Sequence, residues 1–229
     1  MRWAIVVLAG CGRIGFGDVG ASADGNGGVH DALDDGSIVP TGDGSTALGC
    51  ISPGDGDPFN SSTPCGGWGT QIMTQSCALS ESGGMLLVLP TPTVVNARGG
   101  CRRTGAALTA AGVFVEISRV LDQGNTEFVA AAGGASFAMS ISSNTIAFTQ
   151  NGDAMTRAYD PVAMRWLRMR PSGGKLVFET SRDAHTWTIQ RTSTVAVPTM
   201  ADVTIDAVTP AVVVMPGFAQ FEGVDVCPP

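Results

Sequence analysis

Residues 166–187 read WLRMRPSGGKLVFETSRDAHTW. Polar and apolar side chains alternate on both sides of a Gly-Gly pair, which predicts a β-hairpin. With residues 171–174 as the turn, residue 170 faces residue 175 and residue 166 faces residue 179. One face then carries Leu167, Met169, Leu176 and Phe178, and the other carries Trp166, Arg168, Arg170, Lys175, Val177 and Glu179. A slip of one residue would mix these sets, so the alternation indicates an antiparallel pair with one buried face.

From Phe59 onward the sequence repeats this pattern, with short runs rich in Val, Ile, Thr and Phe separated by turn residues. This pattern predicts strands at residues 70–79, 84–90, 112–121, 126–132, 135–142, 145–150, 154–159, 164–170, 175–180, 185–191, 202–208 and 217–226. Only residues 105–111 hold a short helical period. About a dozen strands at this spacing imply one all-β domain over residues 58–229, an antiparallel two-sheet β-sandwich or jelly roll.

The N-terminal part of the chain differs in composition. Residues 12–57 contain thirteen glycines, eight aspartates and a single aromatic side chain, Phe16. Such a segment cannot bury enough apolar surface to offset the entropy of ordering, so we expect a flexible acidic tether over residues 11–57. The net charge of −7 therefore belongs to the tether. The rest of the chain is close to neutral, and it lacks the basic surface that nucleic-acid binding requires.

The first eleven residues, MRWAIVVLAGC, combine one basic residue, a short apolar run and small residues. The run is too short to span a membrane, but it is typical of a secretion signal. Leu8-Ala9-Gly10-Cys11 also resembles the lipobox of bacterial lipoproteins. That resemblance implies a signal peptide over residues 1–10, cleavage before Cys11 and lipidation of Cys11. The protein would then be anchored to the membrane through lipid alone. The alternative is an ordinary secretory signal that happens to contain Cys11.

Several motifs resemble the concanavalin A-like lectin/glucanase (laminin-G-like) jelly rolls. They are DPFN at 57–60 with Trp68, SGGML at 82–86, YDP at 159–161 leading to RWLR at 165–168, SRDAHTW at 181–187, and GFAQFEGV at 217–224. Ala184 stands where the turn S-x-D-G-x-x-W usually has glycine. The resemblance implies a jelly roll whose closing strand lies beside the first. It leaves function open, because this fold hosts lectins, hydrolases and passive spacers.

Catalytic chemistry finds little support in the sequence. Glycanases of this fold use paired carboxylates, often as E-x-D-x-x-E on one strand, and no such motif occurs. Glu179 and Asp183 are close in sequence, but a turn separates them. His30 lies in the tether and leaves only His185, so no catalytic triad is expected. Without a C-x-x-C pair we also expect no metal site, and we expect no cofactor.

The side chains of the hairpin support sugar binding better than they support catalysis. Trp166 could stack on a pyranose ring, while Arg168, Arg170 and Glu179 could bind hydroxyl groups or an acidic sugar. The alternative is that these arginines solvate the outer face and shield Trp166 through their stems. The sequence leaves both interpretations open.

The six cysteines favour export, because disulfides form and persist in exported proteins. If Cys11 is lipidated, five remain: Cys50, Cys65, Cys77, Cys101 and Cys227. The first and last strands adjoin in the resembled fold, which implies a Cys50–Cys227 bridge. Two of the other three can pair, and we favour Cys77 with Cys101.

Together these observations favour an exported, lipid-anchored protein of the bacterial cell envelope that binds a glycan or surface polymer without catalysis. A secreted protein is the alternative location. A structural or protein-interaction module is the alternative function, and a glycoside hydrolase comes third.

Overall fold

The computed structural model describes residues 58–224, except residue 75 and residues 109–110. The expected signal peptide, the tether and Cys11 lie outside the described residues. Cys50 and Cys227 also lie outside them, so their pairing stays a prediction.

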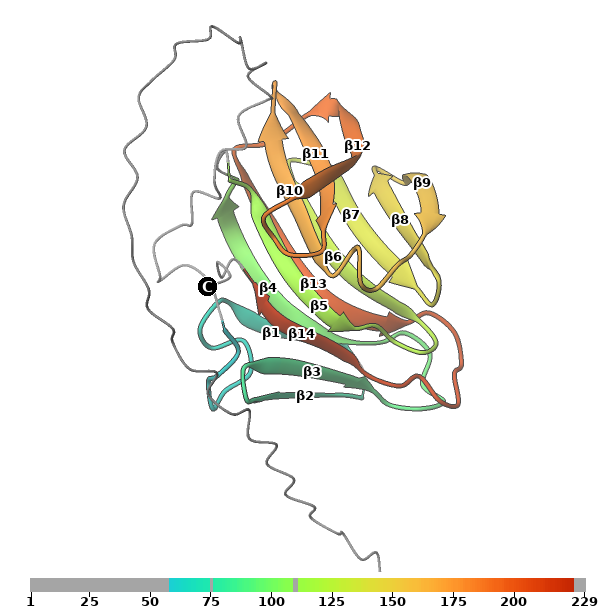
Figure 1. Cartoon of the computed structure of the whole chain (residues 1–229). Coiled ribbons are helices and arrows are strands. Elements are labelled where there is room, and N and C mark those ends of the chain that lie inside the picture. The colour runs from blue at the N-terminus through green and yellow to red at the C-terminus, as the bar shows by residue number, and fades with distance from the viewer. Residues whose placement is uncertain (1–57, 75, 109–110, 225–229) are drawn as a thin grey trace, which may run out of the picture. The chain divides into compact units, whose positions relative to one another are not determined.

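The described residues form fourteen strands and no helix (Figure 1). The strands are β1 (Thr70–Thr74), β2 (Cys77–Ser82), β3 (Met85–Pro90), β4 (Ala97–Ala107), β5 (Val113–Arg119), β6 (Asn125–Ala132), β7 (Ala135–Ser142), β8 (Thr145–Gln150), β9 (Asp153–Ala158), β10 (Trp166–Ser172), β11 (Lys175–Ser181), β12 (Trp187–Ala196), β13 (Met200–Thr209) and β14 (Ala219–Val224).

These strands build two seven-stranded antiparallel sheets. Sheet A has the order β12-β11-β10-β5-β14-β3-β2, and sheet B has the order β1-β4-β13-β6-β7-β8-β9. The expected all-β, antiparallel two-sheet sandwich is therefore confirmed. The expected position of the closing strand is wrong, because β14 pairs with β3 and β5 and lies in a different sheet from β1.

The hairpin of β10 and β11 keeps the predicted faces but has a different register. Its turn is only two residues long, because Gly173 and Gly174 both take positive φ values, as a tight hairpin turn requires. Ser172 consequently faces Lys175, and Arg168 faces Glu179. The difference from the expected register is two residues, which leaves every side chain on its predicted face. Leu167, Met169, Leu176 and Phe178 are fully buried.

Strand β4 was not predicted, and the expected helical turn at 105–111 is wrong where it overlaps this strand. The sequence of β4, ARGGCRRTGAA, has only one β-branched residue, Thr104, yet β4 lies between β1 and β13. Its glycines are needed for close packing. A Cβ atom on Gly99 would lie 2.4 Å from Cys77 Sγ, and one on Gly100 would lie 2.5 Å from Asp206 Cβ. The expected strand 70–79 is in fact β1 and β2, which belong to different sheets.

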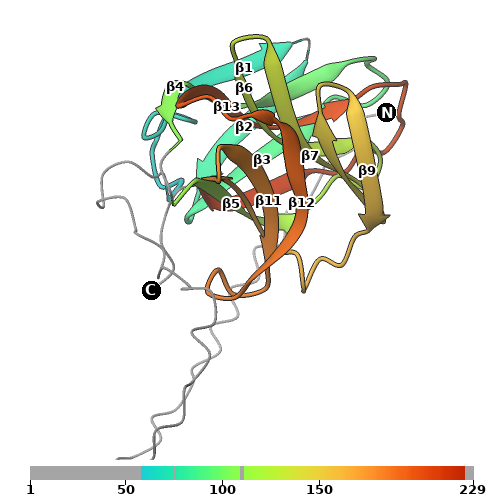
Figure 2. The same ribbon diagram turned by 90° about the horizontal axis from the view of Figure 1, so that it is seen from above.

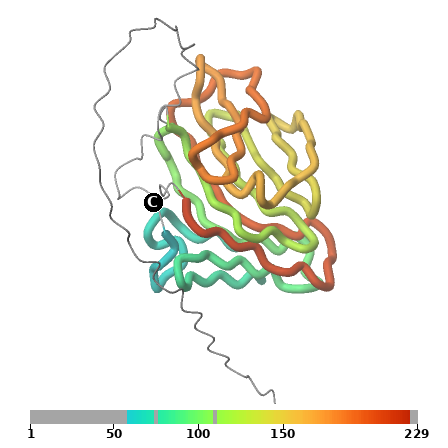
Figure 3. The backbone as a smooth tube through the Cα atoms, in the orientation of Figure 1, coloured from blue at the N-terminus to red at the C-terminus, as the bar shows by residue number. Residues whose placement is uncertain are grey.

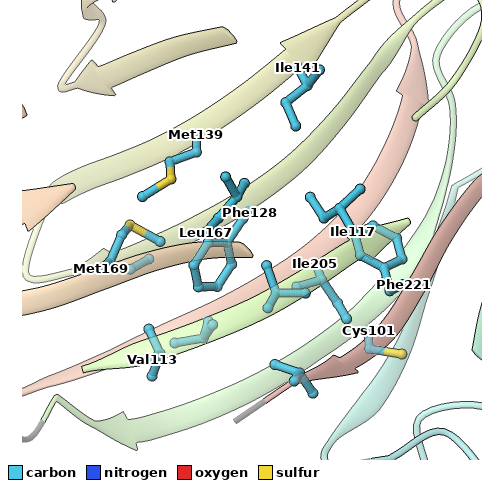
Figure 4. Packing of buried hydrophobic residues seen from close by; sticks show 14 of the residues in the cluster. Cys101, Val113, Ile117, Phe128, Met139, Ile141, Leu167, Met169, Ile205 and Phe221 are labelled. Carbon is cyan, nitrogen blue, oxygen red and sulfur yellow. The ribbon is translucent and has the colours of Figure 1, made fainter. Parts of the chain in front are cut away.

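The core lies between the two sheets. Figure 4 shows Phe128, Met139 and Ile205 of sheet B packed with Leu167 and Met169 of sheet A. All five side chains have no exposed surface. Full burial of such a side chain contributes about 1.5–3 kcal/mol, so this layer holds the sheets together.

The expected Cys77–Cys101 disulfide is wrong. Cys101 of β4 pairs instead with Cys65, at a Cα–Cα distance of 5.5 Å, and Cys77 is a buried free thiol. Cys77 packs over Gly99, two residues away from Cys101 along β4. Because of this offset, Cys77 does not pair with Cys101, and Cys101 forms its disulfide with Cys65 in the loop before β1.

Side chains connect the two sheets along one side. Strand β12 is an edge of sheet A, and it lies close to β8 of sheet B (Figure 2). The Gln150 side chain accepts the Thr194 backbone N–H at 2.7 Å and donates to Thr194 Oγ1 at 2.8 Å. Arg191 Nη1 donates to the backbone oxygens of Phe148 and Asp153 at 2.6 and 2.8 Å. The edge strand β12 thus has hydrogen-bonding partners in the opposite sheet.

Candidate functional site

The predicted site residues of the hairpin come together on the outer face of sheet A. Arg168 Nε donates to Glu179 Oε2 at 2.7 Å. Arg170 donates from Nε and Nη2 to Glu179 Oε1, at 3.0 and 2.9 Å. The Glu179 side chain is only 2% exposed, so one buried carboxylate holds two guanidinium groups. Burial lowers the pKa of Arg168, and the hydrogen bond to Glu179 opposes that shift.

The fourth predicted residue, Trp166, is 8% exposed and packs in a small aromatic cluster. Its ring centroid lies 6.1 Å from that of Phe114 on β5, and Ala184 and Trp187 complete the cluster. The guanidinium carbon of Arg168 lies 4.0 Å from the Trp187 ring centroid, in a cation–π contact. Of the two tryptophans, Trp187 is the more exposed, and sequence reasoning did not assign it to the site.

The turn between β11 and β12 positions Trp187. Asp183 Oδ1 accepts the backbone N–H groups of His185 and Thr186 at 2.9 and 2.8 Å, and these bonds lower the pKa of Asp183. Ala184 takes the usual place of glycine with φ +58° and is fully buried. Its backbone oxygen accepts Trp187 Nε1–H at 2.9 Å. Asp183 therefore holds the turn and makes no bond to Glu179.

A second charged group lies on the same face and was missed from the sequence. Arg165 donates from Nε to Glu116 Oε1 at 2.5 Å and from Nη2 to Glu222 Oε2 at 2.6 Å. Glu116 is on β5 and Glu222 on β14, so one guanidinium links two neighbouring strands. Burial raises the pKa of Glu116, while Arg165 opposes that shift. The alternation of Phe114 and Glu116 along β5 is the signal that could have indicated this group.

A third group lies on the outer face of sheet B. Asp206 of β13 is fully buried; it accepts a hydrogen bond from Arg98 Nε, and it faces Glu127 of β6 directly. Arg98 Nη2 also lies 3.6 Å from Glu127 Oε2. Among the described residues Asp206 Oδ1 accepts no hydrogen bond. Burial raises the pKa of Asp206 to about 7, and Arg98 opposes part of that shift.

Within the described ranges, no cluster of three or more His, Cys, Asp or Glu side chains could hold a metal ion. Those ranges also contain no helix long and apolar enough to cross a membrane.

No family model matches the chain, and no curated protein matches its sequence. Three solved structures are similar in fold. The apo Crh5 transglycosylase has 7% sequence identity and a TM-score of 0.50, over 74% of this chain and 81% of that chain. A mutant of the GH43 protein BlXynB from Bacillus licheniformis has 12% identity and a TM-score of 0.50, over 76% of this chain and 39% of that chain. The Bacillus licheniformis beta-glucanase has 9% identity and a TM-score of 0.49, over 74% and 95%. At these identities the likeness to the first two structures shows the fold alone, a jelly-roll β-sandwich.

Proposed function

We propose that this protein is a lipid-anchored protein of the bacterial cell envelope that binds a carbohydrate or another surface polymer through the outer face of sheet A. The observation that carries the proposal is the pairing of Glu179 with Arg168 and Arg170 beside Trp187. Two guanidinium groups share one carboxylate, so this part of the face has an excess of positive charge. Fixed guanidinium groups next to an aromatic ring suit a sugar that carries a carboxylate.

Arg170 is the side chain best placed to reach a ligand. Its side chain is 27% exposed, whereas those of Arg168 and Glu179 are 9% and 2% exposed. Glu179 engages Nε and Nη2 of Arg170, and among the described residues Nη1 has no partner. That nitrogen can donate two hydrogen bonds. We expect an acidic polysaccharide, such as one containing uronic acid, to bind more tightly than a neutral one.

The test is binding of the full chain to immobilised acidic and neutral polysaccharides. Arg170→Ala is expected to weaken binding to the acidic polymer by about tenfold or more, which corresponds to one good charged hydrogen bond. Arg157→Ala is the matched control, because Arg157 is an exposed arginine on β9 in the other sheet. No binding by the parent chain, or an equal loss in both variants, contradicts the proposal. Circular dichroism checks that both variants fold.

A non-catalytic role is supported by the engagement of the carboxylates on this face. Glu179 is held by two arginines, Asp183 by backbone N–H groups, and Glu116 shares Arg165 with Glu222. Glycoside hydrolysis needs one carboxyl group to donate a proton and a second to act on the sugar. Incubation of the bound polymer with the parent chain is expected to release no new reducing ends.

Two other functions have specific observations in their favour. The low exposure of Trp166 and Glu179 favours a structural or protein-interaction module, in which the network only stabilises the sheet. The raised pKa of Glu116 beside Glu222 favours a hydrolase. If new reducing ends do form, and Glu116→Gln abolishes them, the hydrolase replaces the binding protein.

The lipid anchor is proposed from residues 1–11 alone. Cys11→Ser is expected to move the protein from the membrane fraction to the soluble fraction of a bacterial host. An unchanged distribution would contradict the anchor and leave the binding proposal untouched.

A further inference from the structure

Two loops lie together at one end of the sandwich. One joins β3 to β4 over residues 91–96, and the other joins β13 to β14 over residues 210–218 (Figures 1 and 3). Thr93 N–H donates to the Val213 oxygen at 2.7 Å, and Asn96 N–H donates to the Thr209 oxygen at 2.8 Å. The first bond joins the two loops, and the second joins the β3–β4 loop to the last residue of β13.

The loops expose an apolar surface, which we call the apolar tip. Its members are Val95, Val212, Val214 and Met215, which are 44%, 62%, 70% and 71% exposed. The two loop sequences, TPTVVN at 91–96 and PAVVVMP at 210–216, contain no charged residue. Apolar side chains gathered at one place on a surface mark an interaction site for a protein or a membrane.

The prolines of these loops make them poor partners for a protein strand. Backbone N–H and C=O groups must be satisfied within the protein in the hydrocarbon core of a bilayer, but not at its hydrated interface. Pro210 and Pro216 have no N–H group, and the Pro216 oxygen accepts the N–H groups of Asp122 and Gln123 at 3.0 and 3.3 Å. These features fix both ends of the segment 210–216 and remove two N–H groups from pairing with an incoming strand.

The chain before the domain is long enough for the tip to reach a membrane. Glu81 accepts the backbone N–H groups of Ser61 and Cys65, so the first described residues lie beside the turn between β2 and β3. Residues 91–96 lie at the opposite end of β3. The 47 residues from Cys11 to Asp57 span up to roughly 150 Å when extended, several times the length of a strand.

We propose that the apolar tip inserts into the interfacial region of a lipid bilayer and orients the domain on the membrane surface. The partner is the boundary between head groups and acyl chains, reached by aliphatic side chains on uncharged loops. The inference rests on the proposed lipid anchor only for bringing the domain to a membrane. The insertion itself is a property of the described loops.

The test uses the full chain with Cys11→Ser, so that no acyl chain is attached, and vesicles of phosphatidylcholine. The parent is expected to cosediment with vesicles, and Val214→Asp with Met215→Asp is expected to weaken that partition by about tenfold or more, because each aspartate must be desolvated at the bilayer. The matched control is Val162→Asp with Ile189→Asp, which changes two apolar residues on other elements that are 61% and 58% exposed.

Equal binding by the parent and the tip variant would overturn the proposal, and so would no binding by the parent. Sedimentation velocity without vesicles gives a further outcome. If the parent self-associates and only the tip variant is monomeric, the tip is an interface between copies of the chain and the proposal is wrong. Because Cys11 is replaced throughout, failure of the lipid anchor is read separately, from the distribution of the protein in cells.

Discussion

Arg168 and Glu179 face each other directly across β10 and β11, with Nε 2.7 Å from Oε2 and side-chain exposures of 9% and 2%. An ion pair this buried loses much of its hydration, and it is stable only when its hydrogen-bonding groups are engaged. Arg170 and the Trp187 ring supply those further partners. The face proposed to bind a ligand is therefore fixed before any ligand arrives.

Removal of the shared carboxylate should destabilise the fold. Glu179→Ala leaves the guanidinium group of Arg168 buried without its partner, and we expect the free energy of unfolding to fall by about 3–5 kcal/mol. Urea unfolding followed by tryptophan fluorescence measures this change. Arg170→Ala should cost less, because Arg170 is more exposed and Arg168 still neutralises Glu179. A loss of under about 1 kcal/mol for Glu179→Ala would show that the pair contributes no more than a surface salt bridge.

Asp206 should make stability depend on pH. Its pKa is raised to about 7 in the folded state by burial, so between the unfolded pKa near 4 and this value the folded state binds a proton that the unfolded state releases. The free energy of unfolding should then fall as pH rises through this window and level off above it. Asp206→Asn should remove this part of the slope. We expect the variant to exceed the parent in stability at about pH 8 and to match it at about pH 4.

Urea unfolding of both proteins at the two pH values measures the effect. The difference between them isolates Asp206 from the other carboxylates, including Glu116. A parent chain more stable than Asp206→Asn at the higher pH would mean that the ion pair with Arg98 outweighs the cost of burying Asp206.

The Cys65–Cys101 disulfide should stabilise the domain, because the loop that it closes lowers the entropy of the unfolded chain. The two cysteines are 36 residues apart, which in the loop-entropy account corresponds to about 4 kcal/mol. The double variant Cys65→Ala with Cys101→Ala should lose a large part of that amount in urea unfolding. Peptide mapping of the oxidised parent should recover residues 65 and 101 in one linked fragment. A fragment that links Cys77 to Cys101 would contradict the structure.

Cys77 should resist alkylation in the folded protein. Its thiol is buried, and burial raises its pKa to about 11, so at about pH 8 only about one molecule in a thousand carries the reactive thiolate. Iodoacetamide should leave Cys77 unmodified in buffer and label it completely in concentrated urea, as mass spectrometry can show. Labelling in buffer at the rate of a free cysteine peptide would indicate that β2 opens readily.

The fold could be predicted where one face of a strand pair is apolar. The alternation in residues 166–179 placed Leu167 and Phe178 in the core, and the structure confirms both. The register could not be predicted, because it depends on whether the turn uses two residues or four. Strand β4 could not be predicted either. Its glycines fit only because Cys77 and Asp206, distant in sequence, pack against them.

Which side chains share the outer face of the hairpin could be predicted from the sequence, but their burial could not. Period-two alternation brought Trp166, Arg168, Arg170 and Glu179 to one face. The sequence did not reveal that Phe114 would cover Trp166, because β5 pairs with β10 across about fifty residues. Arg165 with Glu116 and Asp206 with Arg98 were missed for the same reason. Each pair joins residues that are distant in sequence and meet only in the folded sandwich.

The hydrogen bonds of Gln150 with Thr194 affect how the sandwich meets other chains. An edge strand with free N–H and C=O groups is a template for pairing with a foreign strand, which leads to aggregation. In β12 the Thr194 N–H already donates to the Gln150 side chain, and Arg191 extends from the same edge to β8. A neighbouring molecule that tried to add a strand along this edge would first have to break those bonds. The contact that joins the two sheets therefore also disfavours edge-to-edge polymerisation.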